Sequence, residues 1–297
     1  MKALKEALSG ARGAQASAVI LVLLIGYALI VPLFVDDPFQ LSGMSIMDAF
    51  NPPVWMDMGT WAMPLGADDQ GRDMVAAIAY GLRSSIFVGV SSVLIGLILG
   101  GILGLIAGFN GGRIDALIMR TADVQLAYPA LLLAMVIDGI ATAVLGRDRS
   151  IEVAITIVIL SIGIAFWVQY ARTIRASVMV EREQDYVAAA RVTGRSASAI
   201  VIKHILPNVM APVLVIATIN LGIAIITEAT LSFLGIGIPL TYPSLGSLIR
   251  NGNDFLQSGE WWISAWPCLV LVLLVIAVNV LGDHLRDHFN PKIRGRS

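Results

Sequence analysis

The sequence predicts an all-α polytopic membrane protein with six transmembrane helices. Of its 297 residues, 57% are hydrophobic and only 14% are charged, and the apolar residues gather into long stretches. A transmembrane helix needs about 20 mostly apolar residues to cross a hydrocarbon core of about 30 Å. Soluble domains carry roughly a quarter charged residues, so the composition excludes an ordinary soluble protein.

Each predicted span is an apolar stretch between polar residues. Five stretches contain no charged residue, and the sixth contains only Asp138. The first stretch follows a basic tail, but its 23 charge-free residues exceed the core of a signal peptide, so it is interpreted as an uncleaved anchor. The charge-free stretches are 13–35, 84–112, 153–171, 205–227 and 261–282, and the sixth span is expected at about 124–145.

The distribution of basic residues predicts that both termini are cytosolic. With six spans and a cytosolic N-terminus, 15 of the 20 Lys and Arg residues fall on the cytosolic side, in agreement with the positive-inside rule. A further charge-free stretch contains several glycines and prolines. A membrane crossing there would put the basic C-terminal tail outside, so this stretch is predicted to be a re-entrant segment and not a seventh span. The expected organisation is a cytosolic tail at 1–15, a first transmembrane helix at 16–35, an outer loop at 36–83, a core at 84–285 with five helices, and a cytosolic tail at 286–297. Within the core, a cytosolic loop is expected at 172–206 and an outer re-entrant segment at 235–260.

Small residues recur on one face of the second predicted span. Glycines spaced by four form a smooth stripe on a helix, where a second helix backbone can approach closely. Helix packing is therefore the predicted role of this stripe, and a place in the substrate path is the alternative. The stripe consists of Gly96, Gly100, Gly104 and Gly108.

Two acidic residues lie in or beside apolar spans. An ionised side chain at the bilayer centre costs about 2.5–3.5 kcal/mol on insertion scales, so Glu228 and Asp138 are expected to face protein or water. Glu228 is expected near the outer end of its span, at a subunit interface or the translocation cavity, or snorkelling to the outer surface. Ser232 and Phe233 join the two acids as candidates for the translocation path or permease interface.

No enzyme or metal site is expected in this chain. No lysine follows a glycine, which excludes a P-loop for ATP. His284 and His288 have a spacing able to hold a metal, but no third ligand is apparent, so no metal site is predicted. The net charge of −1 gives no indication of nucleic-acid binding.

A polar segment between two apolar stretches carries the functional prediction. Residues 172–204 contain six basic residues. Within this segment, 181–194 can form a short helix with three small alanines at 188–190, which Gly194 ends by adopting a positive φ. A second short helix follows, and Pro207 fits the first turn of the next span. We expect a two-helix knob that a partner can grip; a solvated basic loop is the alternative.

The same segment resembles the EAA loop of permeases of ATP-binding-cassette importers. The matching pattern is Ala188-Ala189-Ala190-x-x-x-Gly194-x9-His204-x-Leu206-Pro207. Further motifs look like the dipeptide/oligopeptide/nickel permease family, C-type subunit. They cover about 65–292 and comprise 65–73, 80–85, 111–115, 119–123, 128–134, 227–235 and 279–287.

The resemblance implies a type I importer permease in a bacterial inner membrane, without catalytic residues of its own. It implies a homologous second permease, two ATPase subunits that bind ATP and Mg, and an extracytoplasmic solute-binding protein. Peptides are the expected solutes, although relatives also handle nickel chelates, opines and sugars. The residues implied to couple to the ATPases are Asp185, Tyr186, Ala188, Ala189, Ala190, Arg191, Gly194, His204 and Pro207.

Some positions depart from the family pattern. Ala188 replaces the usual glutamate, so an acidic contact there cannot be carried over, and Leu245 replaces a tryptophan. His284 and His288 stand where relatives have smaller residues. Two other hypotheses remain: a secondary transporter or channel driven by an ion gradient through the two intramembrane acids, and a membrane scaffold without transport.

Overall fold

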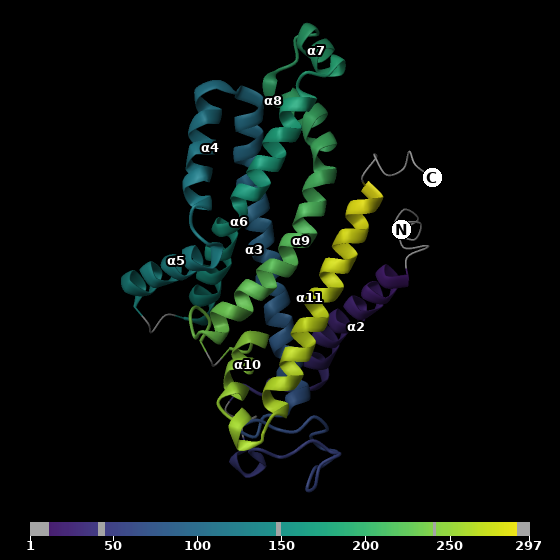
Figure 1. Ribbon diagram of the computed structural model, residues 1–297, viewed down its shortest axis with the longest axis vertical. Helices are drawn as coiled ribbons and strands as arrows, with labels where there is room; N and C mark the ends of the chain where they lie inside the picture. Colours follow the sequence, from purple (N-terminus) through teal and green to yellow (C-terminus); the bar gives the residue numbers. More distant parts are fainter. Residues whose placement is uncertain (1–11, 41–44, 147–149, 240–241, 290–297) are drawn as a thin grey trace.

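The computed structural model describes residues 12–40, 45–146, 150–239 and 242–289, and these ranges contain helices and no strands. Figure 1 shows an elongated bundle with α7 and α8 at one end and α10 at the other. The predicted tails lie mostly outside the described residues. The main helices are α2 (Arg12–Phe34), α3 (Met74–Asn110), α4 (Gly112–Leu126), α5 (Ala130–Leu145), α6 (Ile151–Glu181), α7 (Asp185–Val192), α8 (Ala197–Ile200), α9 (Leu206–Phe233), α10 (Leu245–Asn253) and α11 (Trp262–Phe289).

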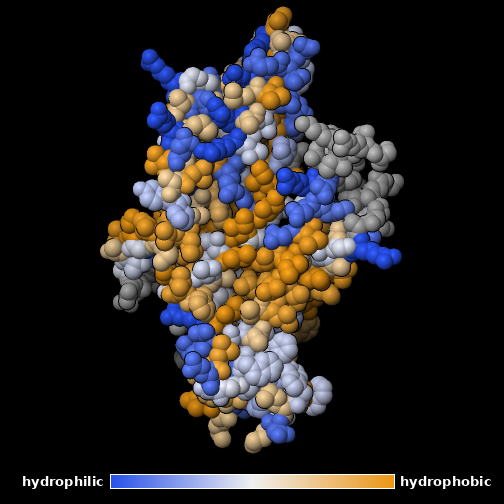
Figure 2. Space-filling model, viewed as in Figure 1, coloured by the Kyte–Doolittle hydropathy of each residue, from blue (hydrophilic) through white to orange (hydrophobic). Residues whose placement is uncertain are grey.

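Within the described ranges, five helices are long and apolar enough to cross a membrane: α2, α3, α6, α9 and α11. Each covers one of the charge-free stretches predicted from the sequence. The helices extend beyond those stretches, because α3 begins ten residues before Ser84 and α6 continues ten residues past Ala171. Parts of the predicted outer and cytosolic loops are therefore helical. Figure 2 shows the result as an apolar band across the middle of the molecule between more hydrophilic ends.

The sixth predicted span is not a single straight helix. Instead, α4 and α5 meet at a bend of 93°, and together they supply the sixth span if the bent pair is counted as one. The break lies at residues 127–129. Pro129 explains it, since proline lacks a backbone N–H and disfavours helical backbone in the residue before it. The charged helix α4 packs along α6, where Arg175 pairs with Asp115 and Gln125 accepts a 2.6 Å hydrogen bond from Trp167 Nε1.

The glycine stripe of α3 lies directly against α6. A Cβ atom added at Gly100 would stand 2.2 Å from the carbonyl oxygen of Trp167, and one at Gly104 would stand 2.6 Å from that of Ala171. Gly96 and Gly108 make similar approaches to Gly163 and Arg175. A Cβ atom does not fit at Gly100, Gly104 or Gly108, and the 3.1 Å distance at Gly96 is tight, so the two backbones touch because the side chains are absent. This contact joins the two longest helices along much of their length.

We expect Gly100→Ala to lower the thermal stability of the purified protein in detergent, because the new methyl group forces α3 and α6 apart. Gly101→Ala is the matched control, since its Cβ would lie 3.7 Å from Ile174 Cδ1, an ordinary contact. Fluorescence-detected melting of both variants makes the comparison. Equal melting temperatures for the two variants would contradict this account of the interface.

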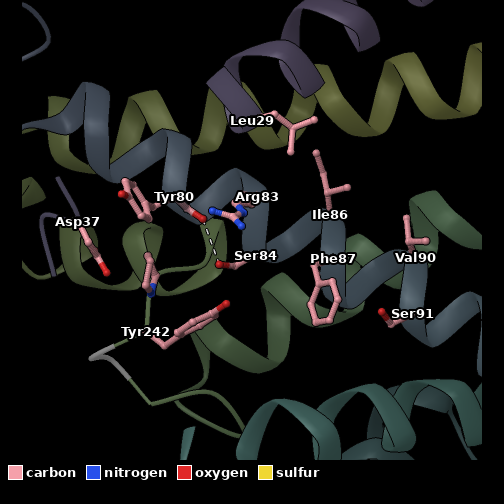
Figure 3. Close-up of a pocket in the computed structure, with 11 residues that line it drawn as sticks. Leu29, Asp37, Tyr80, Arg83, Ser84, Ile86, Phe87, Val90, Ser91 and Tyr242 are labelled. Atoms are coloured by element: carbon pink, nitrogen blue, oxygen red, sulfur yellow. Dashed lines mark hydrogen bonds between the residues drawn. The ribbon is translucent and has the colours of Figure 1, made fainter. Parts of the chain in front are cut away.

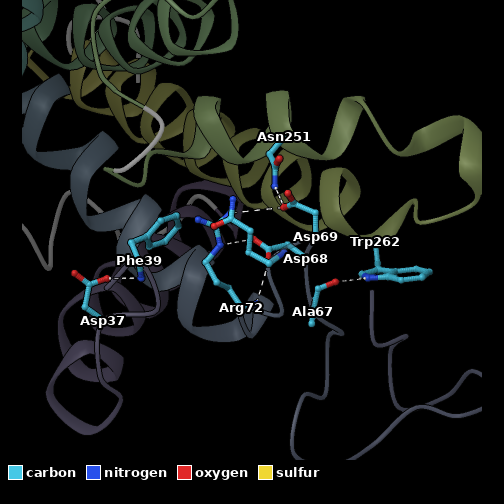
Figure 4. Close-up of polar contacts among 9 residues, drawn as sticks. Asp37, Phe39, Ala67, Asp68, Asp69, Arg72, Asn251 and Trp262 are labelled. Atoms are coloured by element: carbon cyan, nitrogen blue, oxygen red, sulfur yellow. Dashed lines mark hydrogen bonds and ion pairs between the residues drawn. The ribbon is translucent and has the colours of Figure 1, made fainter. Parts of the chain in front are cut away.

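The segment before α3 is fixed to α10 and α11 by buried polar contacts (Figure 4). Asp68 is fully buried and accepts hydrogen bonds from Arg72 Nε at 2.6 Å and from the Arg72 backbone N–H at 2.9 Å. Asn251 Nδ2 donates to Asp69 at 2.7 Å, and Trp262 Nε1 donates to the Ala67 carbonyl at 3.0 Å. The predicted re-entrant segment therefore contains a short helix, α10, that closes this end of the bundle.

Candidate functional site

The two-helix knob predicted from the sequence is present at one end of the bundle (Figure 1). Helix α7 is followed by a turn and by α8, and a π-helical turn at Val201–Ile205 then leads into α9. Pro207 lies in the first turn of α9, as predicted, directly after the π-helical turn. Both helices are short, so the turn between them determines how α7 and α8 are oriented in the knob.

Gly194 makes that turn. Its φ is +75°, a left-handed conformation that side-chain-bearing residues rarely adopt. The N–H of Gly194 donates to the Arg191 carbonyl at 3.0 Å, and the N–H of Arg195 donates to the Ala190 carbonyl at 3.2 Å. These two bonds form a Schellman motif, which satisfies the last carbonyl groups of α7. The predicted role of Gly194 in ending the helix is confirmed.

The three alanines of α7 do not share one environment. Ala188 and Ala189 are exposed, whereas Ala190 is only 7% exposed and belongs to the chain's own core with Val187, which is fully buried. The sequence interpretation placed all three on the docking surface. The structure corrects it for Ala190, because an eight-residue helix can turn only one face outward while the other packs on Ile200. Docking at Ala188 and Ala189 stays a prediction.

Tyr186 connects the knob to both helices that carry it. Its hydroxyl donates to Glu181 at the end of α6 and accepts a 2.9 Å hydrogen bond from Asn208 Nδ2 in α9. Burial, together with the bond to Glu181, raises the pKa of the Tyr186 hydroxyl above its ordinary value. The sequence interpretation named Tyr186 only by resemblance. The contact with Asn208 joins residues 22 positions apart in sequence, which no local pattern reveals.

We expect Tyr186→Phe to weaken the attachment of α7 while leaving the fold intact, since the ring remains and only the hydroxyl is lost. Motion of the knob would then reach α6 and α9 less completely. If the chain is the importer permease that the sequence resemblance implies, the ratio of solute imported to ATP hydrolysed is expected to fall. Glu183→Gln, which alters an exposed carboxylate of the same segment, serves as the control.

Of the remaining residues of the knob, Asp185 and Arg191 are exposed and are available to a partner. His204 lies in the π-helical turn, and its Nε2 atom is buried without a hydrogen-bond partner among the described residues. A π-helical turn is frequently found at functional positions of helices. The docking roles of these residues stay predictions.

Glu228 lies inside the chain and not on its surface. Its side chain is fully buried, and its two carboxylate oxygens accept hydrogen bonds from Ser85 Oγ and Ser232 Oγ, each at 2.7 Å. Ser85 Oγ also accepts the backbone N–H of Leu245 at 3.1 Å. The cluster therefore joins α3, α9 and α10. The expectation that Glu228 has polar partners instead of lipid is confirmed; its assignment to the translocation path stays a prediction.

The other candidates for the path are dispersed. Asp138 in α5 is buried and lines a cavity of about 680 Å³ with residues 235–239, whereas Phe233 is partly exposed at the end of α9. The Ser232 hydroxyl donates its hydrogen bond to Glu228. The structure thus brings Glu228 and Ser232 together and places Asp138 at a separate cavity.

Comparison with known proteins agrees with this architecture. Residues 100–295 match the family described as binding-protein-dependent transport system inner membrane component. The chain is 37% identical over 283 residues to the di/tripeptide transport system permease protein DppC of Pseudomonas aeruginosa, covering 95% of this chain and 89% of that protein. It is 34% identical over 281 residues to the oligopeptide transport system permease protein OppC of Bacillus subtilis, covering 95% and 86%.

A solved structure shares the fold. A chain of the MetNI methionine ABC transporter in an inward-facing conformation aligns with a TM-score of 0.55 at 18% identity, covering 72% of this chain and 96% of that one. The family match and the named relatives, together with the fold, define the permease subunit of an ATP-binding-cassette importer. The chain belongs to the family of binding-protein-dependent transport system inner membrane components, and it is a multi-pass protein of the inner membrane. Such a subunit works with a partner permease, ATPases and a binding protein.

Proposed function

We propose that this chain is one of two homologous permeases that together import peptides from a solute-binding protein. Two ATPase subunits, which hold ATP and Mg, dock on α7 and α8 at the cytosolic end, and both termini of the chain are cytosolic. The end formed by α10 and residues 45–73 faces outward toward the binding protein. The observation that carries the proposal is the α7–α8 knob, with exposed small residues at Ala188 and Ala189, on a chain of this family.

The mechanism follows from how the knob is attached. Val187 and Ala190 pack into the same core as residues of α6 and α9, and Tyr186 bonds to both helices. Closure of the ATPases would therefore move α6 and α9 together with the knob. Rigid-body rocking of these helices alternates access to the path between the two permeases. Peptides are proposed because the relatives that match along most of the chain are named as di/tripeptide and oligopeptide permeases.

Uptake of a labelled dipeptide into proteoliposomes tests the proposal. Uptake is expected only when both permeases, both ATPases, the binding protein and internal ATP are present. Uptake by this chain alone along an ion gradient would support a secondary transporter instead. Normal ATP-driven uptake of a different solute, with none of the dipeptide, would leave the importer assignment in place and overturn the substrate class.

A further inference from the structure

A cavity of about 720 Å³ opens beside α3, between α2 and residues 242–243 (Figure 3). Its wall is mixed in character: Phe87 and Val90 of α3 and Leu29 of α2 give it an apolar side, and Arg83 of α3 gives it a positive charge. Polar groups of the wall are Asp37, Tyr80, Ser84, Ser91 and Tyr242. Cavities that bind small molecules have this combination of apolar wall and few polar groups.

The wall of the cavity is an exposed stripe of α3. Arg83, Phe87, Val90 and Leu94 follow at helical spacing and are all exposed, Phe87 to 57%. A second hollow of about 410 Å³, almost entirely apolar, continues along the same face and shares Val90 with the first. The first hollow therefore has a mixed polar and apolar wall, and the second, next to it on α3, has an apolar wall.

Arg83 stands at the boundary between these two environments. It is the last charged residue before a stretch of α3 that has no other charge, from Ser84 to Asn110. Among the described residues, no carboxylate forms an ion pair with it, whereas Arg72, Arg172, Arg175 and Arg182 all have acidic partners. An arginine facing lipid is costly, so this face is expected to be covered by protein or to line a water-filled path.

The charged residues of the cavity match the two ends of a peptide. The guanidinium of arginine presents a planar set of N–H donors that matches a carboxylate in two parallel hydrogen bonds. Asp37, half-buried in the same wall, offers the opposite charge for an ammonium group. We propose that the cavity lined by Arg83, Tyr80 and Tyr242 binds the terminal carboxylate of the imported solute as it enters the path. This inference rests on the proposed peptide-import function.

Cysteine labelling of the assembled transporter in nanodiscs tests the site without requiring transport. Phe87→Cys is made in a Cys268→Ala background, because Cys268 is exposed and would also react. The rates of modification by an anionic and a cationic methanethiosulfonate reagent are then compared. We expect the anionic reagent to be favoured, and Arg83→Gln to lower the ratio of the two rates roughly tenfold. Arg83→Lys keeps the charge and should keep the ratio, as should Arg120→Gln at the cytosolic end.

Protection by solute identifies the ligand. Dialanine added directly, without the binding protein, should slow the labelling of Phe87→Cys, and dialanine amide, which lacks the carboxylate, should not. Equal protection by both compounds, or an unchanged rate ratio in Arg83→Gln, would overturn the proposal. So would a ratio that follows the content of anionic phospholipid and ignores the peptide, because Arg83 would then hold a lipid phosphate.

The labelling experiment and the uptake experiment can fail independently of each other. If ATP-driven dipeptide uptake fails while the labelling ratio still depends on Arg83 and a free carboxylate protects the cysteine, the site stands and the transport assignment is wrong. If uptake occurs and neither labelling result is obtained, the importer stands and the carboxylate site is wrong.

Discussion

Ala189→Glu is expected to abolish ATP-driven uptake while leaving the permease folded and assembled in the membrane. Ala189 is exposed on the outer face of α7, and its methyl group leaves the helix surface smooth. A glutamate there would add bulk and an unpaired charge to a surface that must fit an ATPase groove, where unpaired buried charge is strongly unfavourable. The measurements are co-purification of the ATPases and uptake into proteoliposomes.

Two matched variants make this result specific. Ala116→Glu places the same side chain on an exposed position of α4 at the same end of the molecule, and uptake should be retained. Ala190→Glu points into the core, so we expect loss of folded protein in addition to loss of docking. Normal uptake by Ala189→Glu with all partners present would show that this face of α7 does not dock.

Glu228→Leu is expected to cause a large loss of thermal stability and of uptake. The substitution removes the acceptor for both Ser85 Oγ and Ser232 Oγ, and a buried donor left without a partner costs about 1–3 kcal/mol. It also loosens the contact of α10 with α3, because Ser85 Oγ accepts the N–H of Leu245. Melting of the purified permease in detergent measures the effect.

Glu228→Gln is the informative companion, since its amide oxygen still accepts one hydrogen bond and its volume is similar. We expect it to lose much less stability than Glu228→Leu. Thr230→Ala is the control on the same helix, because the Thr230 hydroxyl is exposed and donates only to the Ile226 carbonyl of its own helix. If Glu228→Leu were as stable as Thr230→Ala, the serine cluster would not hold the three helices together.

Structural features that depend on a short segment of the sequence were predictable. Stretches without charged residues located five helices, and glycines at a spacing of four located the contact of α3 with α6. Gly194 located the turn after α7, and Pro207 located the start of α9. Each depends on one backbone segment and on a physical rule that acts within a few residues. The fold class followed from these rules and from composition.

Features that depend on which segments meet were not predictable. Ala190 faces inward because it belongs to the same core cluster as Val187 and Ile200. Glu228 can be buried because Ser85 of α3 and Ser232 of α9 donate hydrogen bonds to its carboxylate. The bend at Pro129 divides a stretch whose hydropathy alone suggests one span. The sequence interpretation gave Arg83 no role beyond the family motif at 80–85, because its place in a cavity requires α2 and residues 242–243 beside α3.

The glycine contact gives α3 and α6 the mechanics of a lever. At about 1.5 Å per residue, the 37 residues of α3 extend about 55 Å, well beyond a hydrocarbon core of about 30 Å. A beam of two helices in backbone contact resists bending, so a tilt at one end is carried to the other. A rotation of about 10° would displace the far end by roughly 10 Å. A small tilt at the end of the bundle that carries the knob would therefore produce a large displacement at the opposite end.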